Sequence, residues 1–141
     1  MSPGTAHGRC YCGRVRFEGE LPTKFVTHCH CENCRRAHGA AFVTWAGFRA
    51  GMLRVTAGEQ ELRRYVTDTG ATRSFCATCG TTLFFESPRW KDEVHVAAVH
   101  FEDELDKPPG GHFYADRAVV WCPITDDLPR FGGADGGQRL P

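Results

Sequence analysis

The sequence lacks three features that would place it in a common functional class. No apolar run in its 141 residues approaches the roughly 18 residues that a membrane-spanning helix requires. It has no net charge, because 17 lysines and arginines balance 17 aspartates and glutamates, whereas proteins that bind phosphate backbones usually carry a basic excess. Its first residues, MSPGTAHGRC, show no basic leader followed by an apolar stretch. We therefore expect a cytoplasmic protein that binds neither a membrane nor nucleic acid.

Helical periodicity is also scarce. Only residues 31–39, CENCRRAHG, predict a helix, and a short one. Alternating, β-branched or aromatic segments instead predict strands at residues 13–20, 40–48, 52–58, 61–67, 81–87 and 93–100. In the first of these, Val15 and Phe17 would share one buried face. Short strands separated by turn residues indicate a compact, mostly-β fold.

The length is sufficient for one domain, because a chain of this size buries most of the surface that its unfolded form exposes. We assign residues 1–131 to that domain. The segment DELDKPPGGH at 103–112 combines charge with proline and glycine and predicts a surface loop. The final GGADGGQRLP, residues 132–141, is glycine-rich and predicts a disordered tail.

Cysteine, in contrast, is abundant and clustered. Seven of the eight cysteines fall in the short motifs CYC, CHCENC and CATC, and only Cys122 stands alone. Structural disulfides are rare in the reducing compartment that we expect, and closely spaced cysteines are typical of zinc sites. A closed structural zinc site is commonly built from two cysteine pairs that are distant in sequence. The motifs CYC and CATC provide such pairs, with ligands Cys10, Cys12, Cys76 and Cys79.

The remaining cluster holds Cys29, Cys31 and Cys34, which fill three corners of a zinc tetrahedron. Two interpretations of the fourth corner are open. In one, it is free to bind and activate a substrate, most plausibly a thiol, because sulfur suits a thiolate-bound zinc. In the other, the site is purely structural, and the fourth ligand is one of the residues His28, His30, His38 or Cys122. His30 lies between two ligands, and its side chain could instead be solvated.

Three segments resemble, in order and spacing, the motifs of one known family. They are CYCGRVRFEGE, HCHCENCRRAHGAAF and FCATCGTTLFFE, and the later GGHFYADRAVVW is similar to the closing segment of the same family. The family includes glutathione-dependent formaldehyde-activating enzyme and centromere protein V. The resemblance implies an Mss4-like β fold and two zinc ions per chain. It implies a structural zinc on the ligands Cys10, Cys12, Cys76 and Cys79, and a second zinc on Cys29, Cys31 and Cys34.

The resemblance also implies an activity, which is the addition of the thiol of glutathione to formaldehyde. We therefore predict a zinc-dependent enzyme of the carbon–sulfur lyase type that acts on a small thiol and an aldehyde. The alternative is a zinc-stabilised binding module without catalysis. A third hypothesis, a methionine sulfoxide reductase-like enzyme, requires a reactive cysteine outside the zinc sites, and the apolar setting of Cys122 instead predicts a buried small hydrophobic residue.

Several side chains near the second cluster could assist such chemistry. Arg35 and Arg36 could pair with a carboxylate of the thiol, although a solvated basic turn is the more common role. Trp45 is a better candidate for a pocket wall than Phe42, which we expect to pack in the core. His112 could act as an acid or base, but a hydrogen-bonded structural role is more common for a lone histidine.

Overall fold

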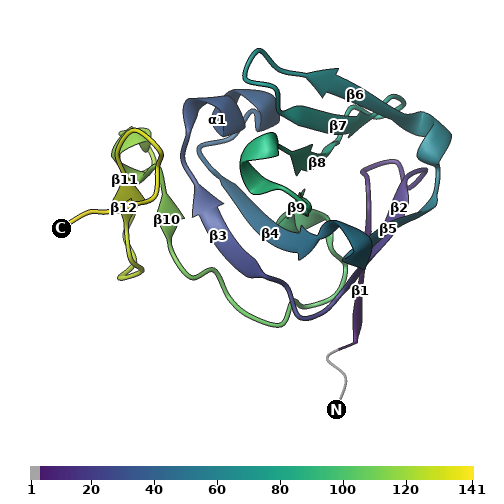
Figure 1. Cartoon of the computed structure of the whole chain (residues 1–141), viewed down its shortest axis with the longest axis horizontal. Coiled ribbons are helices and arrows are strands. Elements are labelled where there is room, and N and C mark those ends of the chain that lie inside the picture. The colour runs from purple at the N-terminus through teal and green to yellow at the C-terminus, as the bar shows by residue number, and fades with distance from the viewer. Residues whose placement is uncertain (1–3) are drawn as a thin grey trace.

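The computed structural model describes residues 4–141, so residues 1–3 of the predicted domain lie outside the described part. The chain forms two β-sheets, one short α-helix and a small C-terminal hairpin (Figure 1). The strands are β1 (Thr5–Arg9), β2 (Arg16–Glu20), β3 (Phe25–Cys29), β4 (Val43–Arg49), β5 (Leu53–Ala57), β6 (Leu62–Val66), β7 (Thr72–Cys76), β8 (Thr82–Glu86), β9 (Glu93–Ala97), β10 (His112–Phe113), β11 (Phe131–Gly132) and β12 (Gln138–Arg139). The helices are α1 (Glu32–His38) and the 3₁₀ turns η1 (Ala50–Met52), η2 (Glu59–Glu61), η3 (Pro88–Trp90), η4 (Ala98–His100) and η5 (Ala115–Arg117).

The larger sheet has seven strands in the order β10-β3-β4-β9-β8-β7-β6, and the smaller sheet has the order β1-β2-β5. All pairings are antiparallel except that between β10 and β3. This arrangement confirms the predicted mostly-β fold. None of the helices formed by residues 4–141 is long and apolar enough to cross a membrane.

The core lies between the two sheets. Phe17 of β2 in the smaller sheet packs edge-on against Phe84 of β8 in the larger sheet, with ring centroids 5.1 Å apart. Val15 and Phe17 are both buried, which confirms the face predicted from their alternation. Burial of a large apolar side chain contributes about 1.5–3 kcal/mol, so these contacts stabilise the sheet packing.

Strand β4 separates this core from a second apolar cluster. Its alternating side chains point to opposite faces, as the pleat requires. Ala46 and Phe48 pack in the core between the sheets, whereas Val43 and Trp45 belong to the second cluster, together with Cys34 of α1. The α-helix therefore covers the face of the larger sheet that the smaller sheet leaves free.

The predicted helix at 31–39 is confirmed as α1, and both of its ends have a local cause. The Cys31 side chain accepts a hydrogen bond from the backbone N–H of Cys34 and so caps the first turn. Gly39 ends the helix in the left-handed conformation, with φ at 60°, which glycine adopts without steric cost. All six strands predicted from the sequence are present with shifted ends, whereas β1, β3, β7 and the two-residue strands β10, β11 and β12 were not predicted.

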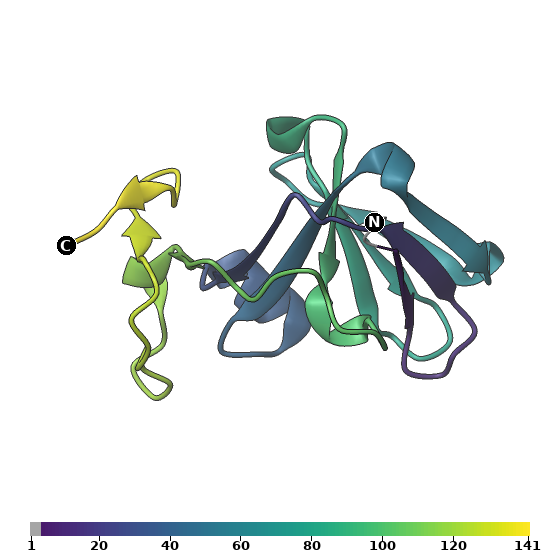
Figure 2. The same cartoon turned by 90° about the horizontal axis from the view of Figure 1, so that it is seen from below.

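The C-terminal segment returns to the larger sheet at β10 and then forms the β11–β12 hairpin. This hairpin lies at the side of the molecule, next to β10, in both views (Figures 1 and 2). The sequence predicted residues 132–141 to be a disordered tail, but the structure pairs Gly132 with Gln138 as two short strands. The hairpin is held by backbone bonds that composition does not reveal. The division of the chain at residue 131 stays a prediction.

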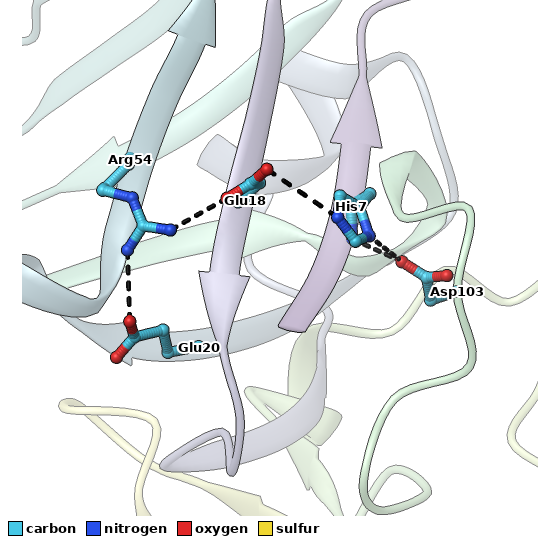
Figure 3. Close-up of polar contacts among 5 residues, drawn as sticks. All are labelled: His7, Glu18, Glu20, Arg54 and Asp103. Atoms are coloured by element: carbon cyan, nitrogen blue, oxygen red, sulfur yellow. Dashed lines mark hydrogen bonds and ion pairs between the residues drawn. The ribbon is translucent and has the colours of Figure 1, made fainter. Parts of the chain in front are cut away.

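A polar network crosses the outer face of the smaller sheet (Figure 3). Arg54 of β5 lies 2.8 Å from Glu18 and 3.2 Å from Glu20 of β2. His7 of β1 lies 2.9 Å from Asp103 in the long loop that follows η4. Exposed ion pairs contribute little stability each. The network therefore fixes the start of the loop beside β1 more than it stabilises the fold.

Candidate metal centres

Four cysteine sulfurs converge where two turns meet. Cys10 and Cys12 lie in the turn between β1 and β2, while Cys76 ends β7 and Cys79 lies in the turn that follows. All four sulfur atoms lie within 4.8 Å of one another. The two turns are also joined directly, because the backbone N–H of Tyr11 donates to Thr81 Oγ1 at 3.0 Å. The structure thus brings together the four residues that the sequence predicted as one group.

The spacing of these sulfurs fits a tetrahedral metal. Zinc–sulfur bonds of about 2.3 Å in a tetrahedron place the sulfurs about 3.8 Å apart. The sulfur of Cys12 lies 3.6 Å from that of Cys10 and 3.8 Å from that of Cys76. Cys10 and Cys76 are buried in the core, with exposures of 1% and 0%. This group could therefore hold a metal ion and tie the two sheets together.

The second group lies where β3 ends and α1 begins. Cys29 ends β3, Cys31 caps α1, and Cys34 is in the first turn of the helix. Their sulfur atoms also lie within 4.8 Å of one another. Cys34 is buried, whereas Cys29 and Cys31 are half-buried. The strand-to-helix turn therefore directs three sulfurs to one point near the surface.

Crowding of these sulfurs changes their acidity. Hydrogen bonds from the Cys29 and Cys34 side chains hold the pKa of Cys31 well below its usual value. Hydrogen bonds with the Cys31 and Cys34 side chains, together with burial, raise the pKa of Cys29 far above its usual value. Three sulfurs this close disfavour three simultaneous negative charges, and a bound cation would offset that repulsion. A soft divalent metal such as zinc is a suitable cation for three sulfur donors.

No fourth side-chain ligand joins this group within residues 4–141. The ring of His28 hydrogen-bonds Thr44 Oγ1 at 2.8 Å, and the ring of His30 hydrogen-bonds His112 at 2.8 Å. His38 packs edge-on against Trp45. Cys122 belongs to neither cysteine group. His28 and His30 are thus engaged in other hydrogen bonds, whereas Nε2 of His38 is buried with no hydrogen-bond partner within residues 4–141. None of these histidines joins the three sulfurs in one group.

A histidine cluster lies beside the cysteine loop and was not predicted. His30 is only 1% exposed, so it is not the solvated side chain that its position suggested. Its ring bonds Nδ1 of His112, and Nε2 of His112 lies 3.0 Å from both carboxylate oxygens of Asp126. The backbone N–H of His30 also donates to the carbonyl of Phe113. The C-terminal segment is thereby attached to the loop between Cys29 and Cys31.

Replacing His112 with alanine should test this attachment. The ring of His112 is 4% exposed, and its loss leaves the buried His30 without its partner. Unpaired buried polar groups and the resulting cavity together cost about 2–3 kcal/mol, so urea denaturation should show a clear loss of stability. His7→Ala is the control, because His7 lies on the exposed outer face of the smaller sheet. Equal denaturation midpoints for the two variants would contradict the attachment.

The other side chains near the second cluster have ordinary structural contacts. The Nε of Arg35 donates to the His30 carbonyl at 3.0 Å, and Arg36 pairs with Glu32 one helical turn earlier. Trp45 is 4% exposed and belongs to the second apolar cluster, so it does not line an open pocket. Phe42 is half-buried against the rings of His28 and His30. Cys122 is half-buried, not the buried residue that its apolar neighbours suggested.

Arg73 of β7 is a further residue that the sequence did not identify. Its Nη2 donates to the sulfur of Cys34 at 3.8 Å, and its guanidinium lies 4.7 Å from the centre of the Phe85 ring. The arginine precedes Cys76 by three residues, which is the only sequence signal that connects it to a cysteine group. No sequence pattern pointed to Asp126, because its contact with His112 depends on the course of the C-terminal segment.

Comparison with known proteins gives consistent matches. The sequence model of a family described as glutathione-dependent formaldehyde-activating enzyme matches residues 5–117. A Halomonas elongata protein named "putative glutathione-dependent formaldehyde-activating enzyme" is 32% identical over 83% of this chain and 79% of its own length. A Schizosaccharomyces pombe protein described as an uncharacterized lyase is 26% identical over 67% of each chain. A Rhodobacter sphaeroides protein of known crystal structure is 33% identical, with a TM-score of 0.60 over 71% of this chain and 91% of its own.

Proposed function

This chain belongs to the glutathione-dependent formaldehyde-activating enzyme family, and we propose that it adds a small thiol to formaldehyde or a similar aldehyde, or catalyses the reverse. The reaction site is the group of Cys29, Cys31 and Cys34. The observation that carries the proposal is that three sulfurs converge there with no fourth side-chain ligand within residues 4–141. Three protein ligands and one open position are the typical coordination of a catalytic zinc.

We further propose that each cysteine group holds one zinc ion. The group of four cysteines would be the structural site, because its ligand set is complete and it joins turns from both sheets. The group of three would be the catalytic site. A zinc ion bound there supplies a positive charge that lowers the pKa of a thiol or polarises an aldehyde oxygen.

The proposed reaction is a simple addition that balances without a redox partner. The thiol loses its proton, its sulfur forms a bond to the carbonyl carbon, and the carbonyl oxygen takes up a proton to become a hydroxyl group. The chain's own contribution is to fix the three sulfurs in place. Capping of α1 by Cys31 and pairing of Cys29 with Val43 of β4 hold the ligands on ordered elements.

The names of two relatives support this reaction type. One relative is named for glutathione-dependent formaldehyde activation, and the other is described as a lyase. Glutathione and formaldehyde are therefore the first substrates to test. Neither Arg35 nor Arg36 is required for the proposal, because both already have partners within the protein.

A rate measurement tests the proposal. Zinc-loaded protein is mixed with formaldehyde and one thiol at a time, namely glutathione, cysteine, coenzyme A or a bacterial thiol, and adduct formation is followed beside the uncatalysed reaction. We expect at least one thiol to react faster than the uncatalysed rate, in proportion to protein concentration. If no thiol does so in either direction, the chain is a zinc-stabilised binding module and the enzymatic proposal fails.

A further inference from the structure

Arg73 is a buried cation without an acidic partner. It lies on β7, the strand next to the edge strand β6 of the larger sheet, and the residue is 8% exposed. No carboxylate lies within ion-pair distance of its guanidinium in the part of the chain from residue 4 to 141. Arginine stays charged in proteins, and buried charges are normally paired. The structure must therefore supply another negative group for Arg73.

The sulfur of Cys34 in the second cluster is the acidic group that Arg73 contacts. Nη2 of Arg73 donates to the sulfur of Cys34, and Nη1 is buried with no hydrogen-bond partner within residues 4–141. The contact with the Phe85 ring satisfies only one face of the guanidinium and none of its N–H groups. The guanidinium thus contacts the cysteine cluster and retains unused hydrogen-bonding capacity.

The net charge of a metal-bound three-cysteine site would give the neighbouring Arg73 a role. Three thiolates and one divalent cation leave one net negative charge, and a fourth thiolate would leave two. A neighbouring guanidinium would bring the loaded three-cysteine site back to neutrality. Residues that hydrogen-bond a metal ligand without binding the metal themselves commonly change the affinity of the site for the metal.

We propose that Arg73 is a positioning residue of the three-cysteine site, which acts through Cys34 to stabilise the charge of the metal-bound cluster. This proposal rests on the proposed function, because it requires a metal at that site. It also gives β7 a double role. The strand carries Cys76 for one cysteine group at its end, and three residues earlier it carries the counter-charge for the other group.

Metal retention in variants of Arg73 tests the proposal. The protein is prepared with zinc in the four-cysteine site and cobalt in the three-cysteine site, and the sulfur-to-cobalt absorption band is followed as a chelator is added. Arg73→Met removes the charge at similar length and should weaken cobalt retention about tenfold or more, with a shifted band. Arg73→Lys keeps the charge and should recover most of the loss. Arg64→Met, on the exposed side of β6, should behave like the unmodified protein.

The outcomes are distinguishable. If the unmodified protein takes up no cobalt at the three-cysteine site, the proposed function fails. If it takes up cobalt, and Arg73→Met retains the metal and the band unchanged, only the role of Arg73 fails. If Arg73→Met does not fold, nuclear magnetic resonance on the unmodified protein tests the role of Arg73 instead. Loading the three-cysteine site should then shift the guanidinium protons of Arg73, and unshifted signals would overturn the proposal.

Discussion

Replacing Cys76 with serine should leave the domain largely unfolded at 25 °C. Cys76 is fully buried at the end of β7, and its sulfur belongs to the group that joins the turn of the smaller sheet to the larger sheet. We propose that this group binds zinc. Binding of a structural zinc contributes about 10–16 kcal/mol of apparent free energy, whereas a domain is stable by about 5–15 kcal/mol. Losing one of four ligands should therefore remove most of the stability.

Circular dichroism melting curves of the zinc-loaded variant measure this effect. Cys122→Ser is the matched control, because Cys122 is half-buried and belongs to neither cysteine group. The control should melt within a few degrees of the unmodified protein, as substitutions away from specific contacts usually do. If Cys76→Ser melts like the control, the four cysteines do not form a structural metal site.

Replacing Cys34 with serine should abolish turnover while the domain stays folded. Cys34 is one of only three protein ligands at the proposed reaction site, and its sulfur also contacts Arg73. Loss of a residue that hydrogen-bonds a metal ligand typically lowers metal affinity or activity about 10–100-fold. Loss of the ligand itself should therefore lower activity by more than about 100-fold. The four-cysteine group is separate, and we expect the zinc proposed there to keep the sheets together.

Three measurements on Cys34→Ser belong together. Adduct formation should fall to the uncatalysed rate, and the melting temperature should drop by much less than in Cys76→Ser, because Cys34 lies in the smaller apolar cluster. Zinc content should fall from two ions per chain towards one. The reverse pattern, a variant that is active but strongly destabilised, would assign the three cysteines a purely structural role.

The cysteine groups could be predicted from the sequence because their chemistry is local. Two ligands separated by one or two residues converge on one point in any tight turn, and the count of seven clustered cysteines divides into four and three. The strand at residues 13–20 was predicted for a similar reason, because Val15 and Phe17 alternate with charged residues. Patterns of this kind need no knowledge of distant contacts.

The surroundings of the second cluster could not be predicted in the same way. Strand β3 contains Thr27 and His28 and lacks a clear alternation, so its edge pairing with β10 gave no signal. Arg73 looks like an ordinary charged residue until β7 is placed next to β8, where it lies opposite Phe85. His30, His112 and Asp126 meet only because the chain returns across 82 residues. Each of these contacts depends on topology.

The most direct test of an open metal position at Cys29, Cys31 and Cys34 is X-ray absorption at the cobalt edge. Protein with zinc in the four-cysteine site and cobalt in the three-cysteine site reports on the second site alone. Without thiol, cobalt should have three sulfur neighbours, which matches the three side-chain ligands that converge there. Adding the thiol that supports turnover should raise the count to four, with the new sulfur at about 2.3 Å. A count that stays at three with every thiol offered would contradict an open metal position that binds the thiol.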